Sequence, residues 1–374
     1  MRLVIDQKQL KPALAKMKSV VDTKSYNAIL HNVKMTTKGK TQVVLTANDL
    51  DRSLEITLGA DVTEKGSYLL DYKKLCKAIA AMKGDVSLES ADDSLASEIS
   101  VFSNPKRRVK LLGLASDEFP ALPAGFKTGH AFDTSMLTGM INSVAYAQSA
   151  DETRPHINGL LIEQKNNRFL TCSTDGHRLA QKIMKHKCPD FTIVPKSSSI
   201  STLLKLLDVP GDVGMSQGSA GVVRFSGSTM LLKKPAQAAK FVFYARETGS
   251  EFPPKDQVIP KKFDACFNMD RAELKKNSDW ICKLTDKNSL GTTLKFDAGT
   301  LNMTSNDVEC DMSYSDNDAI LEPIGVNLGY IQECLAHQFK SCDNIEVCVS
   351  APLDPIVIRN EEQDSLVVVM PMRI

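Results

Sequence analysis

A weak internal repeat restricts the fold of this chain more than any other feature of its sequence. Short apolar stretches run directly into a predicted helix at residues 69–71, 193–195 and 325–327, and these entries lie 124 and 132 residues apart. The expected helices cover residues 7–21, 73–82, 134–147, 197–207, 270–283 and 330–339. A structural unit that returns at a nearly constant spacing indicates a repeat protein. The 374 residues are therefore predicted to form three similar units.

The segments between these helices alternate apolar and polar residues. Residues 41–58 do so around the polar turn Asn48–Asp51, which predicts two antiparallel strands. Similar strand–turn–strand stretches are predicted at residues 160–184, 222–233, 293–312 and 345–369. We therefore predict an α+β fold of three repeated domains, each with two helices packed on small antiparallel sheets.

A short motif marks the expected domain connections. The sequence Asp117-Glu118-Phe119-Pro120 returns 133 residues later as Ser250-Glu251-Phe252-Pro253. Because it recurs at the repeat length and outside the predicted helices, we interpret both copies as segments that join two domains. The expected domains are residues 1–125, 126–256 and 257–374.

Local signals set the expected ends of the first two helices. Asp6 and Gln9 suggest a capping box for the helix over residues 6–21, and Pro12 is expected to kink it. Asp71 is a good N-cap for the second helix, which Gly84 can stop. The apolar face of the first helix is predicted to contain Leu10, Leu14, Met17 and Val21.

Composition limits the function classes. The 46 basic and 45 acidic side chains nearly cancel, which excludes neither nucleic acid nor an acidic partner. The chain has no signal-like start and no apolar run near the ~20 residues of a membrane span, so we expect a cytoplasmic protein without membrane partners. The nine cysteines include no Cys-x-x-Cys pair, which favours reduced thiols. His186 and Cys188 have no second pair at zinc-like spacing, so neither metal nor cofactor is predicted.

The sequence Ser173–Ala180, which contains Thr-Asp-Gly-His-Arg-Leu, allows two interpretations. Asp175 and His177 could form an acid–base pair or ligate a metal. Alternatively, Asp175-Gly176 forms a turn between two strands, which local sequence favours. The chain also lacks a Gly-x-Ser-x-Gly motif, a phosphate-binding glycine loop and a His-Glu-x-x-His motif.

Lysines recur on or beside the predicted helices of all three units. A charged helix face is usually only solvated, but equivalent helices of a repeat protein can line one surface. Such a surface would suit contact with a phosphate backbone. The lysines concerned are Lys73, Lys74, Lys77, Lys196, Lys205, Lys275, Lys276 and Lys340.

The C-terminal residues are unusually apolar. Residues 366–369 are predicted to form a final core strand, and Met370–Ile374 continue it as an apolar tail. A frayed chain end is normally polar, so this tail is expected to cover or receive something.

Several motifs together resemble one protein family. Thr174–Ala180 is similar to a characteristic sequence of the bacterial beta sliding clamps, and Ile157–Glu163 resembles the strand before it. Val369–Ile374 resembles the family's C-terminal tail almost letter for letter, and the two connecting motifs at 117–120 and 250–253 resemble its inter-domain segments. The resemblance runs along the whole chain in the same order.

The resemblance implies a ring. Two three-domain subunits would form a head-to-tail homodimer that encircles double-stranded DNA without regard to sequence, with helices around the hole and sheets outside. Such a clamp performs no catalysis and confers processivity by tethering partners. The implied partners are the replicative DNA polymerase catalytic subunit, the clamp-loader complex and other proteins with a clamp-binding motif.

The resemblance also implies three sets of site residues. A partner-peptide pocket would contain Ile157, Thr174, Gly176, His177, Arg178, Leu179, Pro253, Val258, Asn327, Tyr330, Val368, Met370, Pro371, Met372 and Arg373. DNA would contact Lys24, Lys73, Lys74, Lys77, Lys196 and Lys205. The dimer interface would use Val109, Leu111 and Leu284, near Trp280. Two features depart from the family pattern: the net charge is only +1, and Lys283 falls on an apolar position of the interface.

Three hypotheses follow. The first is a processivity clamp, the second a hydrolase built on Asp175 and His177, and the third a solitary interaction scaffold that never encircles DNA. The missing catalytic motifs count against the second, and the recurring lysines count against the third. A solution mass of twice the chain mass rather than once would favour the ring.

Overall fold

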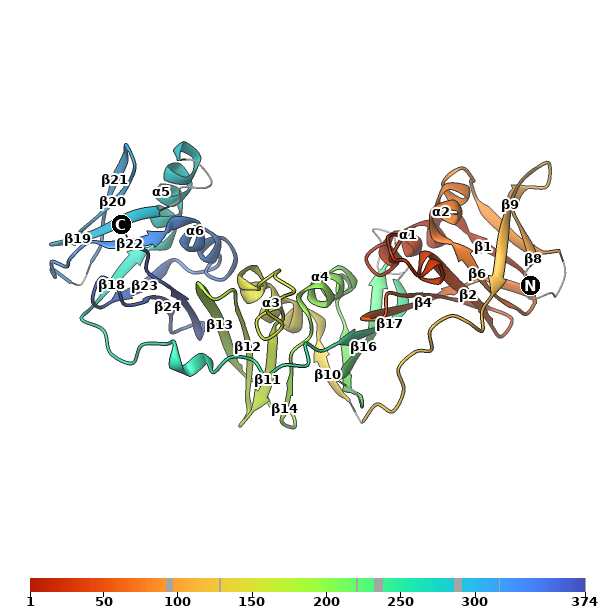
Figure 1. Cartoon of the computed structure of the whole chain (residues 1–374), viewed down its shortest axis with the longest axis horizontal. Helices are drawn as coiled ribbons and strands as arrows, with labels where there is room; N and C mark the ends of the chain where they lie inside the picture. The colour runs from red at the N-terminus through yellow and green to blue at the C-terminus, as the bar shows by residue number, and fades with distance from the viewer. Residues whose placement is uncertain are drawn as a thin grey trace. The chain divides into compact units, whose positions relative to one another are not determined.

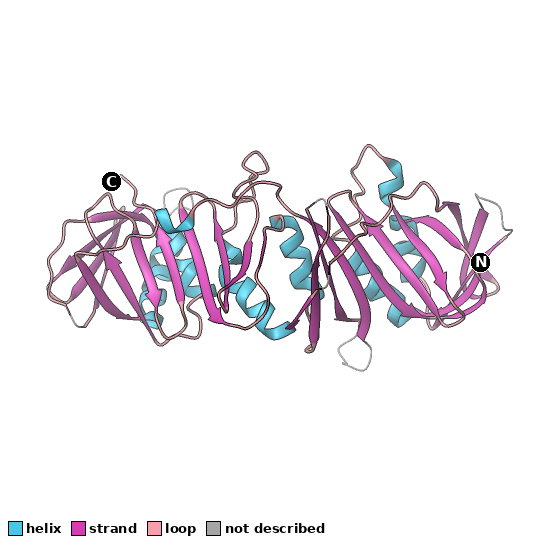
Figure 2. Ribbon diagram, turned by 90° about the horizontal axis from the view of Figure 1, so that it is seen from below, coloured by secondary structure: helices cyan, strands magenta, loops and turns pink. Residues whose placement is uncertain are grey.

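The computed structural model describes residues 1–91, 97–127, 129–219, 221–231, 238–285, 291–315 and 317–373 (Figure 1). The chain forms two compact units. Unit 1 comprises Met1–Thr138 and Ser198–Glu247, and unit 2 comprises Gly139–Ser197 and Thr248–Ile374. The view in Figure 2 shows strands running side by side in each unit, with the helices behind them.

Unit 1 contains one antiparallel sheet of 13 strands in the order β10-β15-β16-β17-β4-β3-β2-β6-β9-β8-β7-β1-β5. Its strands are β1 (Arg2–Asp6), β2 (Asn32–Lys38), β3 (Gln42–Asn48), β4 (Arg52–Gly59), β5 (Asp61–Glu64), β6 (Ser67–Asp71), β7 (Asp85–Ser90), β8 (Ser97–Asn104), β9 (Arg107–Ala115), β10 (His130–Asp133), β15 (Asp212–Gln217), β16 (Val222–Met230) and β17 (Ala238–Arg246). The pairing of β4 with β17 joins the first predicted repeat to the second.

Unit 2 contains a sheet of eight strands, β14-β11-β12-β13-β25-β24-β23-β18, and one of four, β21-β20-β19-β22. Their bounds are β11 (Leu161–Lys165), β12 (Arg168–Thr174), β13 (Arg178–Lys185), β14 (Phe191–Ile193), β18 (Ala265–Asp270), β19 (Gly291–Asp297), β20 (Thr300–Ser305), β21 (Val308–Ser313), β22 (Ile324–Asn327), β23 (Asn344–Val349), β24 (Ile356–Asn360) and β25 (Ser365–Val369). The pairing of β13 with β25 joins the second repeat to the third in the same way.

The helices confirm the predicted repeat. They are α1 (Gln7–Met17), α2 (Tyr72–Ala80), α3 (Thr134–Val144), α4 (Ser197–Leu206), α5 (Arg271–Leu284) and α6 (Leu328–His337), with short 3-10 helices at Ala28–His31, Ala145–Ala147 and Lys255–Gln257. The strands β6, β14 and β22 precede α2, α4 and α6 at the three predicted entries. The α+β fold with antiparallel sheets is therefore confirmed.

Helix α2 illustrates why these segments are helical. The Asp71 side chain caps it by accepting from the backbone N–H of Lys74 at 2.7 Å. Leu75 and Ile79 are fully buried, one helical turn apart. Lys73, Lys74 and Lys77 of the same helix remain exposed, so burial of one apolar face holds the helix on the sheet.

Some local predictions were wrong. Helix α1 ends at Met17, four residues early, and Asp6 caps it by accepting from Lys8 and not from Gln9. Pro12 lies inside this helix. Residues 222–230 form one strand, β16, whose partner β17 starts at Ala238. The predicted end of that stretch, Lys233, lies outside the described residues.

Two turns of the repeat are built alike. In the β3–β4 turn, Asp49 accepts from the backbone N–H of Arg52 at 2.6 Å and from its Nε at 2.8 Å. In the β12–β13 turn, Asp175 accepts from the same two groups of Arg178, both at 3.0 Å. Each carboxylate thus fixes both the backbone and the guanidinium of the arginine three residues later. The internal repeat extends to individual hydrogen bonds.

The structure corrects the expectation that all nine cysteines are reduced thiols. Cys266 and Cys348 form a disulfide, whereas the seven other cysteines are free. None of the helices in the described part of the chain is long and apolar enough to cross a membrane.

Candidate functional site

The candidate site lies on the eight-stranded sheet of unit 2. One register row across this sheet consists of Thr174, Leu179, Val368, Val357, Cys348 and Cys266. Residues directly opposite each other on neighbouring strands point to the same face. The row and its neighbours form a buried apolar cluster, and the segment before β18 packs on it through Phe252, Ile259 and Phe263.

A cavity of about 320 Å³ opens where this segment meets the β12–β13 turn and the end of β25. Its lining is mainly apolar with a few polar groups, which is the usual composition of a binding site. The lining residues are Arg154, His156, Ile157, Thr174, Gly176, Arg178, Leu179, Pro253, Pro254, Lys255, Val258, Val368 and Met370. Nine of the fifteen predicted pocket residues are among them.

The β12–β13 turn shapes one wall of the cavity. The Thr174 hydroxyl donates to the carbonyl of Arg178 at 2.6 Å and accepts from the N–H of Gly176 at 3.1 Å. Gly176 has a φ of +92°, a conformation that strains residues with a side chain. The carboxylate of Asp175 accepts from the N–H of His177 at 2.9 Å as well as from Arg178. Asp175 therefore acts as the structural centre of the turn, and the turn interpretation of this motif is confirmed.

Arg178 connects this turn to the helices of unit 2. Its guanidinium donates to Glu333 on α6 and to the Tyr146 carbonyl, the latter at 2.8 Å, and lies 4.5 Å from the Tyr330 ring centroid. Burial disfavours the charge, but the hydrogen bond and charge of Glu333 and the charge of Asp175 outweigh it and raise the pKa of Arg178. Burial also raises the pKa of the Tyr330 hydroxyl. Arg178 therefore stays charged although only 8% of its side chain is exposed.

Replacing Arg178 by alanine is expected to lower the free energy of unfolding of unit 2 by about 2–3 kcal/mol, because it removes the guanidinium partner of the Asp175 carboxylate, whose side chain is only 18% exposed. Urea denaturation followed by tyrosine fluorescence and circular dichroism measures this. Arg154→Ala is the matched control: its ion pair with Asp151 is about 40% exposed on both sides, so a change under about 1 kcal/mol is expected. Equal losses in the two variants would contradict the assigned role.

The C-terminal tail continues the wall from β25. The N–H of Met370 donates to the carbonyl of His177 at 2.9 Å, and that of Met372 donates to Gly325 at 2.7 Å. These two bonds fix the tail against the turn and against β22. Yet the side chains of Met370 and Met372 remain 39% and 42% exposed. The backbone of the tail is thus held in place, while its two methionine side chains remain accessible to a partner.

Six predicted pocket residues do not line the cavity. Asn327 caps α6 by accepting from Gly329 at 3.0 Å, and Tyr330 packs under Arg178. His177 is exposed on the turn, and Pro371, Met372 and Arg373 continue along the tail. Ile374, the last residue of the predicted tail, lies outside the described residues.

Four lining residues were not predicted: Arg154, His156, Pro254 and Lys255. All four lie within three residues of a predicted one, Ile157 or Pro253, so proximity in sequence was the available signal. Arg154 and Lys255 add cations to the cavity rim. This makes the rim more basic than the sequence motif alone suggests.

The predicted DNA-contact lysines of unit 1 lie on exposed surface. Lys73, Lys74 and Lys77 project from α2, and Lys24 is exposed in the loop after α1. The neighbouring Tyr26, which the sequence did not single out, is fully exposed in the same loop. In contrast, Lys16 of α1 forms a 2.7 Å ion pair with Asp208. Lys205 is exposed on α4, and Lys196 in unit 2 is half-buried.

One predicted interface residue needs correction. Leu111 is only 5% exposed, because it points from β9 into the core of unit 1, whereas its neighbour Leu112 is 65% exposed. Val109 is 38% exposed in unit 1, and Leu284 and Trp280 are 59% and 47% exposed on α5 of unit 2. Leu112 therefore replaces Leu111 as the candidate contact residue. Lys283 lies beside Trp280 in a shallow basic hollow on α5.

Comparison with known proteins agrees with this architecture. The family model for the N-terminal domain of the DNA polymerase III beta subunit matches residues 1–123, and that for its central domain matches residues 131–232. The beta sliding clamp of Pseudomonas aeruginosa is 24% identical over 100% of both chains, and that of Synechococcus elongatus is 24% identical over 96% of this chain and 97% of the relative.

Solved structures share the fold. The DNA polymerase III subunit beta from Pseudomonas aeruginosa has a TM-score of 0.87 at 22% identity, and the C. crescentus beta sliding clamp has 0.89 at 23%, each over 100% of both chains. The two family models together cover more than half of the sequence. The chain therefore belongs to the family of bacterial DNA polymerase III beta subunits, the beta sliding clamps.

Proposed function

We propose that this chain acts as a DNA sliding clamp by closing with a second copy into a ring around duplex DNA. The cavity on the eight-stranded sheet then binds a short peptide of the replicative polymerase, of the clamp loader and of other partners. The observation that carries the proposal is that nine residues from separate parts of the sequence meet around one apolar cavity. This function places the protein in the cytoplasm with the chromosome or another DNA. It requires no catalysis.

The hydrolase hypothesis has little support in the geometry of the turn. Both oxygens of Asp175 accept hydrogen bonds, from the N–H groups of His177 and Arg178 and from the Arg178 guanidinium. A general base needs a free lone pair directed at its substrate.

The limits of the three domains, near residues 125 and 256, stay a prediction that the repeated strand-to-helix entries support.

The helix lysines support DNA contact through phosphates. Binding is therefore expected to be independent of sequence and to weaken steeply with salt. Replacing Lys73, Lys74 and Lys77 by alanine should reduce the slope of log K against log salt by up to about three. The measurement is fluorescence anisotropy of labelled duplex DNA at several salt concentrations.

A matched triple variant controls for net charge. Lys38, Lys40 and Lys65 are also exposed in unit 1, but they lie on strands and turns away from the helices. Their replacement should leave the slope unchanged. An equal reduction in both triple variants would contradict a helix-lined DNA surface.

A separate experiment tests encirclement itself. The loaded ring should be retained on nicked circular DNA and lost from the same molecule after it is linearised.

A further inference from the structure

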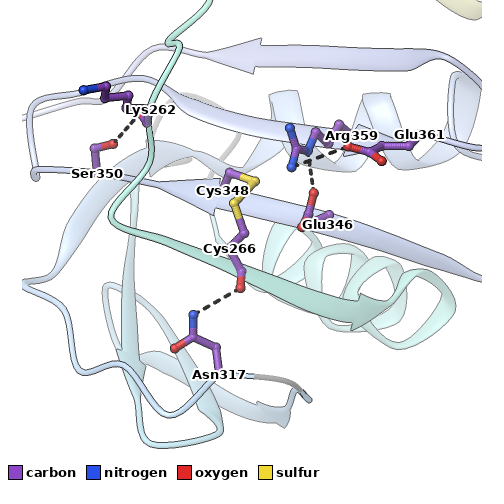
Figure 3. Close-up of a disulfide and its surroundings, with 8 residues drawn as sticks. All are labelled: Lys262, Cys266, Asn317, Glu346, Cys348, Ser350, Arg359 and Glu361. Atoms are coloured by element: carbon purple, nitrogen blue, oxygen red, sulfur yellow. Dashed lines mark hydrogen bonds and ion pairs between the residues drawn. A yellow bond between two sulfur atoms is a disulfide. The ribbon is translucent and has the colours of Figure 1, made fainter.

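The disulfide between Cys266 and Cys348 has no role in the function proposed above. It joins two directly opposed residues of the antiparallel strands β18 and β23, whose Cα atoms are 4.1 Å apart (Figure 3). β18 is the last strand of the eight-stranded sheet. The bond therefore fixes an edge strand that already has its ladder of backbone hydrogen bonds.

The two sulfur atoms belong to residues in different environments. Cys348 is completely buried in the apolar cluster, whereas Cys266 is partly exposed. Cys266 also lines an open hollow of about 710 Å³ on the same face of the sheet. Cys266 is therefore open to a small reagent from this hollow, whereas Cys348 does not line it and is fully buried.

The hollow is polar and mainly acidic. Its lining includes the carboxylates of Asp343, Glu346, Glu361 and Glu362 and one guanidinium, that of Arg359. Arg359 is already paired with Glu346 and lies 3.7 Å from Glu361 (Figure 3). The remaining negative charge favours a cationic reagent over an anionic one.

We infer that Cys266 and Cys348 form a thiol–disulfide exchange site, entered from the acidic hollow at Cys266 and selective for small cationic thiols and disulfides. The inference rests on the proposed cytoplasmic function, because disulfides of cytoplasmic proteins are usually reversible. In reduction, an external thiolate attacks the Cys266 sulfur, the bond to Cys348 breaks, and the Cys348 thiolate takes a proton from water. A second external thiol then releases Cys266 as a thiol and leaves as the small-molecule disulfide, so two thiols supply the two electrons.

Re-oxidation runs in reverse and explains why both cysteines are needed. A small disulfide is attacked by the Cys266 thiolate, which forms a mixed disulfide and releases one small thiol. Cys348, directly opposite on β23, then attacks the Cys266 sulfur and releases the second small thiol. Because the two strands hold both cysteines together, the mixed disulfide does not accumulate in the wild-type chain.

Two single variants of the full-length chain test this order. With cystamine, a cationic disulfide, Cys348→Ser should accumulate one cysteamine on Cys266, because the resolving thiol is gone. Cys266→Ser should be modified at Cys348 at least about tenfold more slowly, since burial restricts access to that thiol. Peptide mass mapping measures each site separately from the other cysteines. Equal rates at the two sites would overturn the proposed entry at Cys266.

The charge of the hollow gives an independent readout. At low salt, cystamine should modify Cys266 in Cys348→Ser about tenfold faster than oxidised glutathione, after correction for their rates with free cysteine, and added salt should reduce the ratio. A ratio that stays near one would overturn the selectivity. The double substitution Glu361→Gln and Glu362→Gln should lower the ratio of the cystamine rate to the glutathione rate.

One competing chemistry shares these atoms. The sulfurs of Cys266 and Cys348 and a carboxylate oxygen of Glu346 lie within 4.8 Å of one another, a spacing that could hold a metal ion. Stoichiometric zinc in the untreated full-length protein, lost in Cys266→Ser, would overturn the disulfide assignment. Alkylation of wild-type Cys266 only after treatment with dithiothreitol would support it. None of these readouts depends on DNA or peptide binding, so they are separable from a failure of the proposed function.

Discussion

Deleting Met370–Ile374 is expected to abolish binding of a peptide of the type Gln-Leu-x-Leu-Phe while the protein remains dimeric. The tail supplies one wall of the cavity: Met370 lines it and is 39% exposed. Methionine side chains are flexible and polarizable, which suits a wall that must accept different peptides. Loss of the contact to a buried anchor side chain costs about 2 kcal/mol or more, which is at least roughly 30-fold in affinity.

The deletion also removes two backbone hydrogen bonds, those of Met370 with His177 and of Met372 with Gly325. A substitution that leaves the tail in place separates binding from stability. Val258 lines the cavity and is 44% exposed, so Val258→Asp should weaken the peptide at least about tenfold without unfolding the protein. Ile320→Asp is the matched control, because Ile320 is 69% exposed elsewhere in unit 2.

Fluorescence anisotropy with a labelled peptide measures all three variants, and thermal denaturation reports their folding. If the tail only seals the surface, the deletion variant will lose thermal stability and the wild-type chain will bind no peptide. Intact binding by a folded deletion variant would exclude Met370, Pro371, Met372 and Arg373 from the site.

Replacing Leu112 and Leu284 together by glutamate is expected to convert the protein from a dimer to monomers. Both side chains are more than half exposed in the single chain, and they lie on β9 of unit 1 and α5 of unit 2. In a head-to-tail ring these surfaces of two copies meet, and apolar exposed residues are typical of an interface centre. Two buried, unpaired carboxylates at its centre should cost several kcal/mol, about a thousandfold or more in the dissociation constant.

Light scattering at micromolar concentration gives the mass, which should fall from twice the chain mass of 41.0 kDa to once. The matched control is Leu50→Glu with Ile320→Glu, which changes two equally exposed apolar residues outside the proposed interface. A monomeric wild-type chain would contradict the ring.

The sequence predicts this fold well where a pattern is local. The helices after β6, β14 and β22 follow from three similar entries, and the β12–β13 turn follows from Asp175-Gly176. The side of β9 to which a leucine points is not a local property. Leu111 and Leu112 are equally apolar, and only the pairing of β9 with β8 decides that Leu111 is buried.

The disulfide, which lies outside the cavity, depends on a contact between residues that are distant in sequence. Cys266 and Cys348 are 82 residues apart, and nothing in their spacing indicates that β18 and β23 are neighbours. Asn327 and Tyr330 were assigned to the pocket through the family resemblance, but in the structure they hold α6 and Arg178 in place. Sequence similarity thus identifies the region of a site better than the task of each residue within it.

The repeated Asp–Arg turn has a mechanical consequence for a ring. Arg52 donates hydrogen bonds from its turn to Ser198 and Thr202 of α4, as Arg178 does to Glu333 of α6. In both turns the arginine therefore bonds to the second helix of the following repeat. The corresponding β20–β21 turn has only Asn306 and Asp307 between its paired residues and carries no arginine. In the ring that we propose, the helix facing this third turn belongs to the other subunit. This third turn therefore offers no arginine to bond that helix, and we expect a load on the ring to open it between the subunits before it separates the repeats within each chain.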